Sequence, residues 1–164
     1  EHVEVVSAMP VRAIITGEVD TLTLNNAGAC YLDVLLICEL IRTTGLREVD
    51  LRNNSLGVES ARCVVECLSS HRYDVKLEVF NSLPMQGLLH GSCDKIDGSQ
   101  RDLTDFDAYI VGGLVPNLDE GALLSSVDMS KNSFSLRGGT RWLAEAFLAG
   151  NYSRVDDFRL ACKL

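Results

Sequence analysis

The sequence lacks two features that would direct it to a membrane or a nucleic acid: a long hydrophobic run and an excess of basic residues. The apolar run at residues 34–38 stops at Glu39, far short of the roughly 20 residues that a transmembrane helix needs. Fifteen lysines and arginines stand against 23 aspartates and glutamates, so the net charge is −8, whereas a free-standing nucleic-acid-binding domain is normally basic. With no signal peptide or basic targeting arm either, we expect an intracellular, cytoplasmic protein that binds neither nucleic acid nor membrane.

The sequence also lacks the motifs of common catalytic, metal and cofactor sites. No G-x-G-x-x-G or P-loop pattern occurs, and the six cysteines include no C-x-x-C pair with histidine partners for zinc. His2, His71 and His90 have no serine or aspartate at a spacing typical of a nucleophilic site. We therefore expect no enzymatic activity, no metal and no cofactor.

Two further groups of reactive residues have structural interpretations. Asp105 and Asp107 coincide with a predicted helix start, where carboxylates complement the helix dipole. Cys63 and Cys67 lie four residues apart, on one side of a predicted helix. We expect the cysteines to be buried free thiols in a reducing compartment.

What the sequence does contain is enough apolar material for one ordinary domain, arranged in repeats. Hydrophobic residues make up 46% of the 164 residues, which is typical of globular proteins. Residues 3–11 align with residues 77–85, and residues 46–56 align with residues 124–134. The repeats predict a short, a medium and a long unit, then the same three again, then the start of a seventh.

The clearest unit begins at Leu46 and fits the pattern L-x-x-L-x-L-x-x-N-x-L, with Val49, Leu51 and Asn54 at three of its key positions. Val49 and Leu51 alternate with charged residues, as in a strand with one buried face. Apolar residues at positions 61, 64, 65 and 68 then recur at helical spacing. Each medium or long unit is thus predicted to be a strand followed by a helix. The short segments at residues 9–17 and 83–92 have room for a turn or a brief 3₁₀ helix.

On these residues the sequence resembles leucine-rich repeat proteins of the ribonuclease-inhibitor type. The resemblance implies an α/β solenoid, a horseshoe with a parallel strand row on its concave face and helices on its convex face. It implies a single domain over residues 1–164, with about six units, a truncated last strand and both ends open, as in a fragment of a longer array. Stacked units would place Val49, Ile96 and Val127 in one continuous core.

Three glycines fall where such units would carry larger residues. Gly98 occupies an inward strand position and leaves a gap that a neighbour must fill. Gly112 and Gly113 lie in the following predicted helix and weaken it. The unit at residues 93–123 is therefore expected to be the least stable.

The open face of the strand row is the predicted binding surface. The residues between the inward strand positions are mostly acidic, and in stacked units they would lie about 5 Å apart. Arg52 and Phe80 follow on the same rim, and an exposed aromatic residue is typical of an interface anchor. The predicted contact residues are Glu4, Asp50, Arg52, Glu78, Phe80, Asp97 and Asp128.

These residues predict a non-catalytic scaffold that binds a protein partner with a basic surface or segment. One interpretation needs no partner: strand faces are polar in any acidic chain, and Phe80 could pack into its own short unit. Two other functions stay open. The chain could be a structural subunit or segment of a large multi-protein assembly, packing on further repeats through its ends and outer helices. The resemblance also permits the sensor or regulatory repeat region of an immune-type or GTPase-regulating protein.

Overall fold

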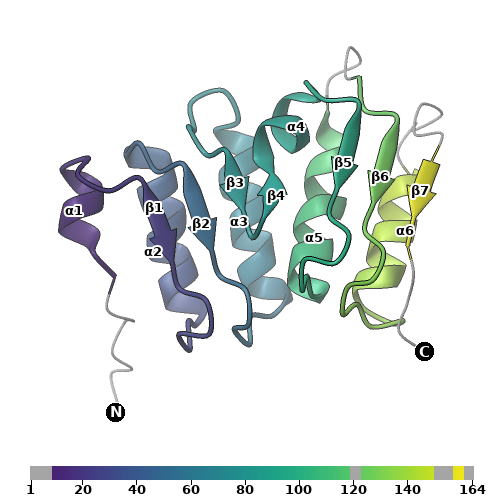
Figure 1. Cartoon of the computed structure of the whole chain (residues 1–164), viewed down its shortest axis with the longest axis horizontal. Helices are drawn as coiled ribbons and strands as arrows, with labels where there is room; N and C mark the ends of the chain where they lie inside the picture. Colours follow the sequence, from purple (N-terminus) through teal and green to yellow (C-terminus); the bar gives the residue numbers. More distant parts are fainter. Residues whose placement is uncertain (1–8, 119–122, 150–156, 161–164) are drawn as a thin grey trace.

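The computed structural model describes residues 9–118, 123–149 and 157–160. Figure 1 shows the strands side by side in one layer, with α2, α3, α5 and α6 packed behind them. In chain order the strands are β1 (Thr21–Thr23), β2 (Glu48–Asp50), β3 (Val79–Phe80), β4 (Leu83–Pro84), β5 (Lys95–Asp97), β6 (Ser126–Asp128) and β7 (Asp157–Arg159). The helices are α1 (Val11–Ile15), α2 (Tyr31–Thr43), α3 (Val58–Ser70), α4 (Met85–His90), α5 (Asp105–Leu114), the 3₁₀ turn η1 (Val115–Asn117) and α6 (Gly139–Ala149).

The strands form two small sheets. The first has the order β1-β2-β3-β4, in which β1, β2 and β3 are parallel and β4 runs antiparallel to β3. The second has the order β5-β6-β7 and is parallel throughout. The fold is therefore a small α/β domain with one mixed and one parallel sheet.

This arrangement overturns the predicted fold class: the solenoid horseshoe with a single parallel strand row is wrong. The row breaks at a tight reversal where Asn81 and Ser82 take left-handed backbone angles, with φ of 49° and 66°. Leu83–Pro84 then pairs back onto Val79–Phe80, and β4 occupies the edge of β3 that a further parallel strand would have used. The short segments also differ from expectation, because each holds a one-turn α-helix (α1 and α4) after its proline.

A single hydrophobic core nevertheless runs beneath both sheets. Val49, Ile96 and Val127 are all at most 1% exposed and belong to the same core cluster. Behind the strands, α5 packs between α3 and α6. The core therefore joins the two sheets, although their backbone hydrogen bonding does not.

The glycines in the second half allow close packing. A Cβ at Gly98 would lie 2.7 Å from the Met129 sulfur and 3.1 Å from a Leu83 methyl group, so these neighbours already fill the expected gap. A Cβ at Gly112 would lie 2.7 Å from the Trp142 indole, and one at Gly113 would lie 2.8 Å from Val65. Glycine at these two positions lets α5 approach both neighbouring helices closely.

Asparagine side chains satisfy backbone groups where the strands end. Asn54 donates to the carbonyls of Leu24 and Leu51 at 2.8 and 2.7 Å and accepts from the Ala29 amide at 2.8 Å. Asn132 makes the equivalent contacts in the second sheet. These bonds fix the loops that carry the chain from strand to helix.

A third asparagine, Asn81, lies at the tight reversal between β3 and β4. Asn81 accepts from the Leu51 amide at 2.6 Å and donates to the buried Asp107 carboxylate at 2.6 Å. Asp107 in turn accepts from the Thr104 amide at 2.8 Å at the start of α5. Its predicted helix-capping role is thereby confirmed, and burial raises the pKa of its carboxyl group.

Candidate functional site

The predicted acidic row forms two separate, shorter rows. Thr23 is the register partner of Asp50 in the first sheet. In the second sheet, Asp97, Asp128 and Arg159 are register partners across β5, β6 and β7. Figure 1 shows the strands that carry these residues in a layer in front of the helices. Glu4 lies outside the described residues.

The predicted position of Glu78 in this row is wrong by three residues. Phe80, not Glu78, lies beside the core position Val49, because Leu77-x-x-Phe80 repeats the spacing of Leu46-x-x-Val49. Glu78 instead lies just before β3, exposed at the edge of the sheet. There it forms an ion pair of 2.7 Å with Arg47.

Phe80 is completely buried, with 0% of its surface exposed. Its ring lies 6.3 Å from the ring of Phe106, centroid to centroid, inside the core. The prediction that Phe80 is an exposed interface anchor is therefore wrong. It acts as a core residue at the break between the two sheets.

Asp50 and Arg52 neutralise each other. The Arg52 guanidinium contacts both carboxylate oxygens, with N–O distances of 2.8 and 2.9 Å. Their side chains are only 15% and 24% exposed. The hydrogen bond from Arg52 holds the pKa of Asp50 below its usual value. Such a closed pair offers little attraction to a charged partner.

Two arginines also bridge the break between the sheets. Arg52 donates to the carbonyl of Arg101, in the loop after β5, at 3.4 Å. The Arg101 guanidinium in turn donates to the carbonyl of Ser82, in the turn between β3 and β4. The function of Arg52 in the fold is therefore to hold Asp50 and to tie the first sheet to the loop after β5.

Asp97 and Asp128 differ from Asp50. Asp97 accepts hydrogen bonds from the Ser99 amide and hydroxyl at 3.0 and 2.7 Å, and Asp128 accepts from the Ser130 amide at 2.9 Å. The Ser99 bonds lower the pKa of Asp97, so it is ionised at neutral pH. Within the described part of the chain, no lysine, arginine or histidine forms an ion pair with either carboxylate. The two carboxylates line a shallow hollow of about 430 Å³ with Lys95, Ser125, Ser126 and Arg159.

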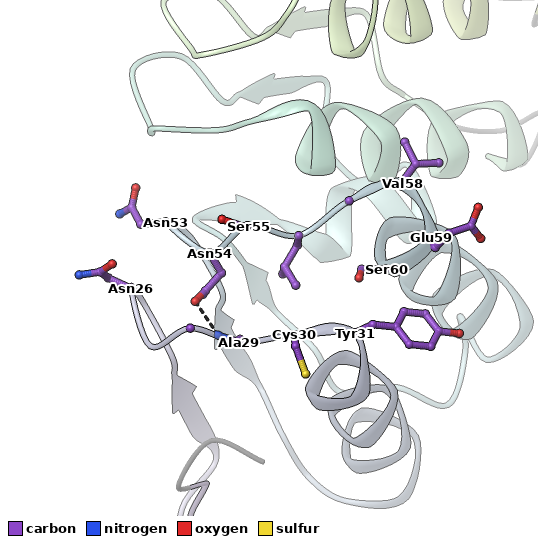
Figure 2. A pocket seen from close by; sticks show the side chains of 13 residues that line it. Asn26, Ala29, Cys30, Tyr31, Asn53, Asn54, Ser55, Val58, Glu59 and Ser60 are labelled. Atoms are coloured by element: carbon purple, nitrogen blue, oxygen red, sulfur yellow. Dashed lines mark hydrogen bonds between the residues drawn. The ribbon is translucent and has the colours of Figure 1, made fainter. Parts of the chain in front are cut away.

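A second hollow, of about 640 Å³, lies between the starts of α2 and α3. Figure 2 shows its lining side chains and the hydrogen bond from the Ala29 amide to Asn54 across its floor. α2 is capped by Asp33, which accepts from the Cys30 amide at 2.8 Å, whereas no side chain caps the start of α3 at Gly57. Glu59 is the one charged side chain in the lining. Among these lining residues, no hydrogen bond joins Glu59 to Cys30 or to a serine.

Trp142, for which the sequence left core and surface positions open, packs between helices. Its indole stacks on the Tyr109 ring at 4.1 Å with an interplanar angle of 8°. The side chain is partly buried over Gly112. Trp142 therefore fastens α6 to α5.

The described histidines do not converge with a nucleophile. The ring of His71 lies 3.1 Å from the carbonyl of Cys67, and the ring of His90 stacks on Tyr73. His2 lies outside the described residues.

Over residues 9–118, 123–149 and 157–160, no group of three metal-ligating side chains is placed to hold an ion. None of the helices described there has the length and apolar character to cross a bilayer.

Comparison with known proteins adds no relative: no family model and no curated protein matches this chain. The resemblance to leucine-rich repeat proteins stays a prediction from the residues.

Proposed function

We propose that the protein is a non-catalytic protein-binding module that contacts a basic segment of its partner through the strand side of the second sheet. The observation that carries this proposal is the Asp97–Asp128 pair, two in-register carboxylates without a cationic partner among the described residues. Adjacent strands lie about 4.8 Å apart, so the two charges repel each other, and a lysine or arginine of a partner would relieve that repulsion.

The groups around the pair set the position of the partner. Lys95 and Arg159 line the same hollow and disfavour a second cation on either side of the pair. The hydroxyl groups of Ser125 and Ser126 add neutral hydrogen-bonding groups at the rim. This arrangement favours a single basic side chain flanked by polar residues over a uniformly basic surface.

The proposed location is intracellular and cytoplasmic. The five cysteines among the described residues are all free thiols, which is typical of proteins in a reducing compartment.

The proposal is tested with a fluorescent decapeptide that has one central lysine and serine at the other positions, whose binding is followed by anisotropy. The double substitution Asp97→Asn/Asp128→Asn should weaken binding about tenfold, since two partly exposed ion pairs are worth roughly 1.4 kcal/mol together. Raising the salt to about 0.3 M should weaken binding to the unmodified protein as well.

The matched control is Asp20→Asn/Glu78→Gln, which removes the same two charges from carboxylates that already face Arg47. This control should change binding less than twofold. Equal losses in both double variants would show that only net charge matters and would contradict the proposed site.

A helix-side contact is the second candidate, in which the protein is a structural segment of a larger assembly. At the start of α2, Tyr31, Leu32 and Leu35 are 44%, 54% and 41% exposed, and neighbouring exposed apolar groups are typical of contact surfaces. If this surface drives assembly, the protein sediments as an oligomer and Leu32→Ser/Leu35→Ser restores a monomer. The control Leu148→Ser changes an exposed leucine on α6 and should leave the sedimentation unchanged.

A further inference from the structure

Three thiols lie along the contact between α2 and α3. Cys38 belongs to α2, and Cys63 and Cys67 belong to α3, one helical turn apart. All three are half-buried. They are therefore covered by neighbouring side chains yet still reached by solvent.

Two of these thiols, Cys38 and Cys67, are neighbours, and the third, Cys63, contacts a different residue. The Cys67 sulfur lies 3.4 Å from the backbone carbonyl oxygen of Cys38, and each of the two thiols shifts the pKa of the other. The Cys63 sulfur instead lies 3.4 Å from the hydroxyl of Tyr31. Cys38 and Cys67 therefore contact each other across the helix pair, and Cys63 has a different neighbour.

We propose that Cys38 and Cys67 are a redox-active dithiol, which hydrogen peroxide converts into an intramolecular disulfide that joins α2 to α3. The two helices are packed neighbours, and the carbonyl carbon links the contacted oxygen directly to the Cys38 Cα. The contact places the Cys67 sulfur against the backbone of Cys38, and the proposed disulfide requires that rotation of the two side chains brings the sulfurs to bonding distance with the Cα atoms close together.

The surroundings assign different roles to the two sulfurs. The neighbouring Cys38 thiol and the positive charge of Arg42 lower the pKa of Cys67, whereas burial and Glu39 act in the opposite direction. The Cys67 thiol and burial raise the pKa of Cys38. In the proposed reaction Cys67 is therefore the attacking thiolate, and Cys38 is the thiol that resolves the product.

The reaction consumes one peroxide and releases two waters. The Cys67 thiolate attacks one peroxide oxygen, the O–O bond breaks, and the products are a sulfenic acid on Cys67 and a hydroxide that takes up a proton. The Cys38 sulfur then attacks the Cys67 sulfur, the S–O bond breaks, and the departing hydroxide leaves as water with the Cys38 proton. The two thiols lose two electrons in total, and the peroxide gains them.

The disulfide would close a loop between positions 29 residues apart, with β2 inside it. A cross-link of this kind stabilises a fold mainly by restricting the unfolded chain. For a protein of this size we expect the melting temperature to rise by roughly 5 to 10 °C on oxidation. The change would confine α2 and α3 and leave the Asp97–Asp128 surface untouched.

The experiment treats the reduced full chain with hydrogen peroxide, alkylates the remaining thiols and digests the protein with trypsin without reduction. Mass spectrometry should find one cross-linked peptide pair, and fragmentation should place the link between Cys38 and Cys67. Either Cys38→Ser or Cys67→Ser should abolish the link and the rise in melting temperature. Circular dichroism confirms that each variant is folded, and fragmentation of the unsubstituted protein locates the link without any variant.

Matched controls come from the neighbouring cysteines. Cys30→Ser and Cys63→Ser should leave both the link and the melting shift intact, because neither residue belongs to the contacting pair. A link through Cys30 or Cys63, disulfides between molecules only, or oxidation of Cys67 to the sulfinic acid without a link would each overturn the proposal.

Discussion

The two sheets carry aspartates at the same strand position but use them in different ways. In the first sheet, Asp50 is held by Arg52, two residues further on, and the pair is mostly covered. In the second sheet, the residues two positions after Asp97 and Asp128 are Ser99 and Ser130, which hydrogen-bond to the carboxylates without neutralising them. The comparison shows that the residue two positions along the chain decides whether a strand carboxylate is paired with a cation or accepts only neutral hydrogen bonds.

The two sheets also differ in the contacts that hold them to the rest of the molecule. The first sheet ends in the antiparallel β3–β4 pair, and Arg52 and Arg101 reach across from it to the loop after β5. The second sheet is held to the rest by the core and by α5, which its glycines bring close to α3 and α6. The charged residues Asp50 and Arg52 of the first sheet contact each other within the fold, whereas the carboxylates of the second sheet are the basis of the proposed binding.

The largest expected effect comes from removing the buried ring at the junction of the sheets. Phe80→Ala should lower the free energy of unfolding by about 3–5 kcal/mol, because it deletes a fully buried aromatic side chain. Urea denaturation followed by circular dichroism measures the loss. Val79→Ala, at the half-buried neighbour, is the control and should cost clearly less; equal costs would contradict the core position of Phe80.

The next largest effect distinguishes the mostly covered Asp50–Arg52 pair from the exposed Arg47–Glu78 pair at the sheet edge. Arg52→Met leaves Asp50 half-buried without its cation, and we expect a loss of about 1–3 kcal/mol in unfolding free energy. Arg47→Met removes an arginine whose pair with Glu78 is exposed, and it should cost at most about 0.5 kcal/mol. The ranking is checked by urea denaturation of both variants, and a reversed order would show that Arg52 is not a structural tie.

A third prediction concerns a variant that recreates, in the second sheet, the arginine–aspartate pair of the first sheet. Ser130→Arg places an arginine two residues after Asp128, as Arg52 stands after Asp50, and it should neutralise that carboxylate. Binding of the lysine–serine decapeptide should fall about fivefold, while the unfolding free energy stays within about 0.5 kcal/mol of the original. Lys131→Arg, at the adjacent exposed position, is the control and should leave binding unchanged.

The smallest effect is a pH dependence that belongs to the first sheet. Because Arg52 lowers the pKa of Asp50 in the folded protein, the ionised carboxylate contributes stability above the unfolded pKa of about 3.9. That contribution is lost as the pH falls through the folded value. The unfolding free energy is measured at steps of about half a pH unit from pH 6 down to the lowest pH at which the protein is folded. It should fall less steeply with decreasing pH in Asp50→Asn than in the original protein. Parallel curves for the two proteins would contradict the shift.

Much of the local structure was predictable. Helical spacing of apolar residues correctly indicated the helices that became α2, α3 and α5, since one buried face repeats every three to four residues. The strand around Val49 followed from its alternating pattern, and Asp107 followed from its place at a helix start. These features depend on neighbours within one unit of the chain.

The candidate site was predictable in part. Asp50, Asp97 and Asp128 do lie on strands, but the structure removes Phe80 from the surface and Glu78 from the row. The spacing Leu77-x-x-Phe80 repeats Leu46-x-x-Val49, and this match indicates both the core position of Phe80 and the place of Glu78 before the strand. The sequence places Arg52 two residues after Asp50 and Ser99 two residues after Asp97, but only the structure shows that the Arg52 side chain folds back onto Asp50.

The sequence by itself determined the alternation of strands and helices, the common core of Val49, Ile96 and Val127, and the acidic character of the strand side, since each follows from residue type and short-range period. Only the tertiary structure decided that β4 turns back and splits the strands into two sheets, that Arg52 closes on Asp50, and that Cys38 meets Cys67. The physical reason is that these outcomes depend on contacts between segments 2 to 49 residues apart, whose geometry is set by a tight turn at Asn81–Ser82 and by helix packing that no periodic pattern encodes.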